Sequence, residues 1–176
     1  MSVLDIIGKE DLKDVLGKGW MTHDGMWFFH VQNELGMDAA NRLNRAAISS
    51  LAQFEVPRMK AALGMENCTF SKLDDVKTFM EGAMALVMPP FMKFTYSFTP
   101  PDTFSYEWEK DQCFAFKGVR RIGKISEYRC GVMYRIDRWL DALGLSYEGP
   151  QVEECRMHTL GRCKGEYKFR LPGGEK

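Results

Sequence analysis

The spacing of apolar residues predicts a helical N-terminal half. Between residues 38 and 63 apolar side chains recur every three or four positions, the period of an amphipathic helix, and Pro57 is expected to kink or split that helix. Gly36 and Gly64 are typical stop signals on either side of it. The expected helices cover residues 11–19, 25–35, 38–63 and 71–88. Residues 1–90 therefore form a predicted helical subregion.

After Pro90 the period changes from about 3.6 to two. Segments 91–98 and 104–116 alternate aromatic and polar residues, which is typical of half-buried strands. A helix is expected at 126–143, and a hairpin at 151–171 that turns near Leu160 and Gly161. The pattern predicts an α+β protein in which N-terminal helices pack on an antiparallel sheet, within a strand-strand-helix-strand-strand C-terminal core. We expect one domain over residues 1–176, with residues 91–172 as its α+β ligand-binding core.

Composition narrows the classes of partner. The chain has 24 basic and 24 acidic residues, so no global charge attracts nucleic acid. No apolar run is long enough for a membrane span or a signal peptide, which predicts a cytoplasmic protein. Five cysteines cannot all pair with one another, and a reducing compartment favours free thiols or metal ligands over disulfides.

Four of these cysteines fall where a fold could bring them together. Cys130 lies at the start of the expected helix, and Cys155 and Cys163 lie on opposite arms of the expected hairpin, whose strands would be about 5 Å apart. Zinc usually takes four such ligands. The candidates for the fourth ligand are Cys113, in an expected strand, and Glu153, Glu154 and His158. Zinc is the first choice of cofactor and an iron–sulfur cluster the second; buried inert thiols and redox chemistry are the other interpretations.

The run CGVMYRIDRWLDALGLSYEGPQVEECRMHTLGRCKGEYKF resembles the C-terminal core of 4-vinyl reductase-type domains, which are small-molecule-binding modules related in fold to sensor and vesicle-tethering proteins. In aromatic-sensing members, three cysteines with this spacing hold zinc together with a glutamate. Cys130, Cys155 and Cys163 match that spacing, and Val152 stands at the position of the glutamate. The resemblance implies a zinc clip that pins the last strands to a helix.

The N-terminal half is similar to a bacterial family of unknown function that includes proteins labelled L-2-amino-thiazoline-4-carboxylic acid hydrolase-like. The similarity is carried by an aspartate, glycine and tryptophan pattern, here Asp24, Gly25 and Trp27. No motif in this sequence shows hydrolysis, and Trp27 is counted among the candidate ligand-binding residues.

Other residues are candidates for binding a ligand. His30 and Glu34 are four positions apart on an expected helix and could share a metal or a proton, although a hydrogen-bonded surface histidine is the simpler interpretation. Met84 and Met88 continue a methionine stripe that suits either an adaptable pocket or an ordinary core. Arg120 lies in a basic turn that could receive a carboxylate or phosphate.

Three functions stay open on these grounds. The leading hypothesis is a domain that binds an apolar or aromatic small molecule and carries a structural zinc clip. The alternatives are a metal-assisted hydrolase of a small heterocycle or amide, and a structural or oligomer-forming protein, for which a homodimer is the expected assembly.

Overall fold

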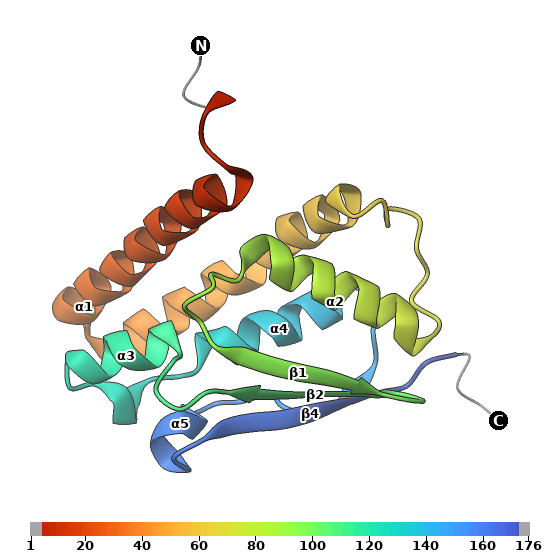
Figure 1. Ribbon diagram of the computed structural model, residues 1–176. Coiled ribbons are helices and arrows are strands. Elements are labelled where there is room, and N and C mark those ends of the chain that lie inside the picture. The colour runs from red at the N-terminus through yellow and green to blue at the C-terminus, as the bar shows by residue number, and fades with distance from the viewer. Residues whose placement is uncertain (1–4, 173–176) are drawn as a thin grey trace.

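The computed structural model describes residues 5–172 and has an α+β fold (Figure 1). Its elements are α1 (Lys9–Ala62), α2 (Leu73–Val87), β1 (Phe94–Thr99), β2 (Thr103–Trp108), α3 (Phe114–Arg121), the 3-10 turn η2 (Ile125–Glu127), α4 (Gly131–Ala142), β3 (Tyr147–Glu148), α5 (Arg156–Thr159) and β4 (Cys163–Phe169). The strands form one antiparallel sheet in the order β1-β2-β4-β3. The predicted class, helices first and an antiparallel sheet afterwards, is confirmed.

The sheet has one buried face, as its period of two predicts. Phe104, Tyr106 and Trp108 of β2 and Tyr167 of β4 are all at most 3% exposed. The residues between them on β2 and β4 face the other side and are more accessible. The helices α2, α4 and the second half of α1 lie over the sheet, so the core is sandwiched between the two layers (Figure 1).

Helix α1 consists of two arms that meet at Gly36. We call residues 9–35 the first arm and residues 37–62 the second arm. Gly36 has φ 83° and ψ 170°, a conformation that is essentially restricted to glycine, and the chain reverses direction there (Figure 1). The stop predicted at Gly36 is therefore present, but the two helices expected before it are one continuous helix.

The second arm continues as a helix through Pro57, so the predicted split is wrong. A proline removes the hydrogen bond to the carbonyl four residues earlier, here that of Gln53. Gln53 and Pro57 both lie on the exposed side of the arm, where water can serve that carbonyl. Val56 and Met59 on the opposite side remain buried at 1% and 4% exposure, and their packing holds the helix together.

Two predicted elements of the C-terminal half are corrected by the structure. The strand expected to run to Phe116 ends at Trp108, and α3 follows, since Phe116 and Val119 bury one face of a helix at a spacing of three. The hairpin expected at 151–171 does not form: β4 pairs with β2 and with the short β3, and α5 occupies the place of the first arm of that hairpin.

A polar clasp joins the second arm to α4 inside this core. Glu55 accepts hydrogen bonds from Arg135 Nε at 3.0 Å and from Trp139 Nε1 at 2.7 Å, and it pairs with the Arg135 Nη2 group as well. The side chains of Arg135 and Glu55 are only 19% and 11% exposed.

Within residues 5–172, no helix has the length and apolar character needed to cross a membrane.

Candidate ligand pocket and cysteine cluster

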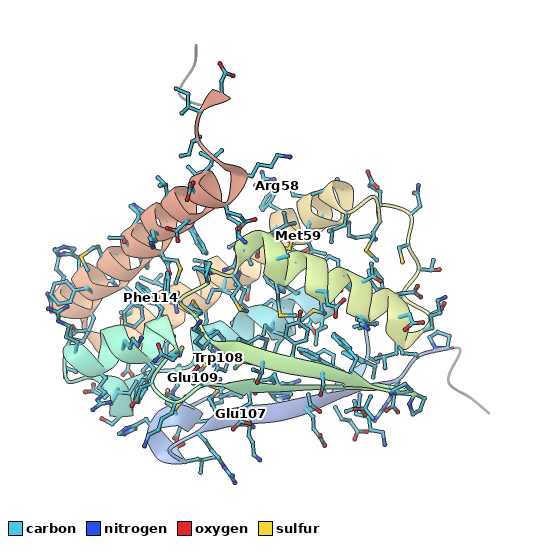
Figure 2. All side chains as sticks on the ribbon, in the orientation of Figure 1. Arg58, Met59, Glu107, Trp108, Glu109 and Phe114 are labelled. Carbon is cyan, nitrogen blue, oxygen red and sulfur yellow. The ribbon has the colours of Figure 1, made fainter. Side chains whose placement is uncertain are left out.

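The first arm of α1 covers a cavity of about 380 Å³ between the helices and the end of the sheet. We call this cavity the main pocket. Its apolar lining comes mostly from aromatic and methionine side chains: Trp20, Met21, Met84, Met88, Met92, Trp108, Phe114, Tyr128 and Trp139. Trp108 is the last residue of β2 and Phe114 the first residue of α3, and both lie at the same end of the sheet (Figure 2). A volume of this size is within the range of small-molecule sites.

Arg135 is one of two charged residues that line the main pocket. Its guanidinium carbon lies 4.8 Å from the centre of the Trp20 ring and 5.3 Å from that of Trp139, so two indoles contact the cation. The bonds to Glu55 fix the side chain between them. Arg135 is thus held by protein groups on several sides, and Glu55 balances its charge.

Asp24 of the first arm is the other charged residue of the lining. Its carboxylate has no hydrogen-bond partner among the described residues. Partial burial raises the pKa of Asp24, and the nearby charges of Arg135 and His23 oppose this shift without reversing it. The pocket therefore contains an acid at its rim whose hydrogen-bonding capacity is unused.

The cysteine cluster lies on the other side of Trp108 and Tyr128. Cys113, Cys130, Cys155 and Cys163 all line one small cavity of about 10 Å³ there. Three of them are the N-cap residues of helices α3, α4 and α5, and Cys163 is the first residue of β4. Sequence reasoning placed Cys113 and Cys155 on strands, which is wrong, yet all four thiols reach the same place.

The thiols of the cluster are poor nucleophiles as they stand. Burial raises the pKa of Cys113 to about 11 and that of Cys163 to about 12, and raises the pKa of Cys130 further. Their proximity adds to the effect, because each thiolate disfavours another: Cys155 raises the pKa of all three. The backbone amides of the first turns of α3 and α4 oppose the shift only in part.

The fit of a metal ion to this cluster is mixed. Four thiols are suitable donors for zinc. Even so, no three His, Cys, Asp or Glu side chains within residues 5–172 are arranged so that they could hold a metal ion. Zinc binding would require the thiols to move closer to one another.

The non-cysteine candidates for the fourth ligand lie outside this cavity. Glu153 pairs with Arg45, one of its bonds being 3.0 Å long. Glu154 and His158 are exposed. Cys113 is the one candidate for the fourth ligand that lines the cavity with the other thiols.

The structure places only part of the predicted ligand-binding set at the main pocket. Met84 and Met88 line it. Trp27, His30 and Glu34 are exposed on the first arm and do not line it, and the pair at spacing four forms no hydrogen bond. Arg120 is ion-paired with Asp111 at 3.5 Å on α3 and also lies outside the pocket.

Sequence reasoning missed the residues that give the pocket its polarity. Arg135 and Trp139 follow at a spacing of four on α4, and Trp20 and Asp24 do so on the first arm. That shared spacing is a signal that two helices present aromatic and charged side chains on one face each. Nothing in the sequence shows that those faces meet.

Asp137 is a buried acid that lines neither the main pocket nor the cavity of the cysteine cluster. Asp137 is 1% exposed and accepts a hydrogen bond of 2.8 Å from the Tyr167 hydroxyl through Oδ1. Its Oδ2 atom and the Tyr106 hydroxyl have no partner among the described residues. Burial raises the pKa of Asp137 to about 6, with the Tyr167 hydrogen bond working against the shift.

Comparison with known protein families identifies a match to the N-terminal part of the chain. Residues 5–84 match the model of a family of unknown function, DUF6125. The matched segment comprises α1 and nearly all of α2, and so it includes one wall of the main pocket and none of the sheet. No curated protein and no solved structure matches the chain. The resemblances to 4-vinyl reductase-type domains and to thiazoline carboxylate hydrolases therefore stay predictions.

Proposed function

We propose that this protein binds an apolar or aromatic small molecule in the main pocket. The observation that supports the proposal is a cavity of about 380 Å³ lined by three tryptophans, a tyrosine and four methionines, with few polar groups. A core built only for stability would close such a space, because an unfilled apolar cavity costs free energy. The methionines can adapt their side chains to ligands of different shape.

Ala47 offers a direct test because it lines the main pocket and has a small side chain that a substitution can extend into it. Its neighbour Ala46 is exposed on the same arm and does not line the pocket. We expect 1-naphthylmethanol to raise the melting temperature of the wild type and of Ala46→Phe, and to have no effect on Ala47→Phe. Equal shifts in both variants, or none in the wild type, would contradict the proposal.

The zinc clip is a separate part of the proposal. Four thiols from α3, α4, α5 and β4 around one cavity support it, since a divalent ion would balance the negative charges that make their deprotonation unfavourable. The ion would be structural and would tie together segments that are far apart in sequence. The 4-vinyl reductase-like spacing supports the same assignment, with Cys113 in place of the glutamate.

Metal content of the purified full-length protein tests the clip. We expect about one zinc per chain in the wild type and in Cys68→Ser, whose thiol lies outside the cluster. Cys130→Ser is expected to lose the metal, and a chelator should expose the C-terminal third to hydrogen exchange first. Metal-free wild-type protein with unchanged exchange after chelation would rule the clip out.

Other features of the structure bear on the two alternative functions. The hydrolase alternative relied on an open coordination position at the metal or on His30 and Glu34. His30 and Glu34 lie outside the main pocket, so they add no support to it. The oligomer-forming alternative, including a homodimer, suits the exposed apolar residues of the first arm. These are Val15, Leu16, Trp20, Met26, Trp27 and Leu35. Sedimentation at several concentrations distinguishes it from a monomer.

A further inference from the structure

The charge balance of the main pocket constrains the chemistry of its ligand. Arg135 and Asp24 are the charged residues of the lining. The positive charge of Arg135 is neutralised by Glu55, which binds it through two nitrogens. Asp24 has no such partner among the described residues, so its carboxylate, when ionised, is a surplus negative charge in the lining.

Other cations near Asp24 do not cancel this surplus. His23 is its exposed neighbour on the first arm and lowers the pKa of Asp24 less than Arg135 does. Arg121 of α3 lines a second cavity that Asp24 also lines, and no ion pair joins these two side chains. The rise in the pKa of Asp24 shows that burial outweighs these neighbours.

The apolar part of the lining also favours positive charge. The rings of Trp20, Trp108 and Tyr128 face the same cavity as Asp24. Aromatic faces attract cations, and Trp20 already does so with Arg135. An anionic ligand would meet the unpaired carboxylate and an arginine whose best donors are occupied.

We propose that the main pocket takes an aromatic amine in its protonated form, the ring lying among the tryptophans and methionines and the ammonium group bound by Asp24. This inference rests on the proposed function and adds the ligand's charge to it. Asp24 then supplies charge-assisted hydrogen bonds to the ammonium group. The first arm, which covers the pocket, is also the element that presents this acid.

Three ligands of nearly the same shape separate the effect of charge from that of shape. They are 1-naphthylmethylamine, 1-naphthylmethanol and 1-naphthoate, measured by calorimetry at pH 7 on the full chain. The wild type should bind the amine about ten times more tightly than the alcohol, the size of one charge-assisted hydrogen bond at a partly exposed site. The carboxylate should bind most weakly.

Two variants locate the preference. Asp24→Asn should bind the amine and the alcohol with equal affinity, while Asp38→Asn, an exposed acid of the second arm that does not line the pocket, should keep the tenfold difference. If the alcohol binds but the amine has no advantage, or if Asp24→Asn retains the preference, the inference is wrong and the proposed function stands. If none of the three ligands binds the wild type, both are wrong.

Discussion

Asp137 should make the protein more stable as the pH falls from 7.5 to 5. Its pKa is raised from 3.8 to about 6 in the folded protein, mainly because burial disfavours the charged carboxylate. The folded state therefore binds a proton that the unfolded state has already lost, and stability decreases as the pH rises between these two values. A difference of about two pH units corresponds to about 3 kcal/mol at pH 7.5, of which about half is recovered by pH 5.

Asp137→Asn removes this titration and leaves the shape of the side chain almost unchanged. The Asn oxygen can still accept the hydrogen bond from Tyr167, while its amide group would lie where Oδ2 now has no partner. An unsatisfied amide costs about 1–3 kcal/mol, similar to the cost of the buried charge, so the two proteins should have comparable stability at pH 7.5. At pH 5 the wild type should be ahead by about a further 1.5 kcal/mol.

Urea denaturation monitored by fluorescence of the four tryptophans measures this difference. Asp14→Asn is the control, because Asp14 forms a surface pair with Lys18 on the first arm and should change the pH profile by less than about 0.5 kcal/mol. If the wild type and Asp137→Asn keep a constant stability difference from pH 5 to pH 7.5, then Asp137 does not titrate in this range and the reasoning fails.

Two further predictions concern the scaffold and are checked by the same denaturation assay. Gly149→Ala should destabilise the fold by more than about 3 kcal/mol, because a Cβ atom at φ 127° would collide with the Glu166 carbonyl, whereas Gly118→Ala on α3 meets nothing within 4 Å and should stabilise by about 0.5–1 kcal/mol. Glu55→Gln should lower the free energy of unfolding by about 2 kcal/mol, since it leaves the Arg135 cation without a counter-charge in a largely buried position. A loss of stability below about 0.5 kcal/mol in either the Gly149 or the Glu55 variant would contradict the packing described above.

The local pattern of apolar residues was sufficient to predict the fold class. It was insufficient to predict how the C-terminal elements are connected. Burial of one side of each element sets the apolar period of the second arm and of α2, and the alternation in β1 and β2. Such periods can be read from the sequence. The segment FAFKGVRR has a period of two in its first residues, and it forms a helix because Phe116 and Val119 bury one face at a spacing of three. Residues 155–163 are too few to reveal that α5 and not a strand leads into β4.

The candidate sites, like the fold, could be predicted from the sequence only in part. The four cysteines meet although two of their expected strands are helices, because a residue at a helix N-terminus can reach the same cavity as one on a strand. The position of Asp24 in the same pocket as Arg135 depends on how the first arm folds back over α4. That arrangement is tertiary, and no spacing along the chain encodes it.

Gly36 influences the geometry of the main pocket although it does not line that pocket. Its backbone conformation sets the angle at which the first arm returns across α4, and with it the separation of Trp20 and Asp24 from Arg135. Any side chain at this position would favour another angle. Changes in ligand selectivity could therefore arise from substitution of a solvent-facing glycine, and a mutagenesis programme confined to the cavity walls would overlook it.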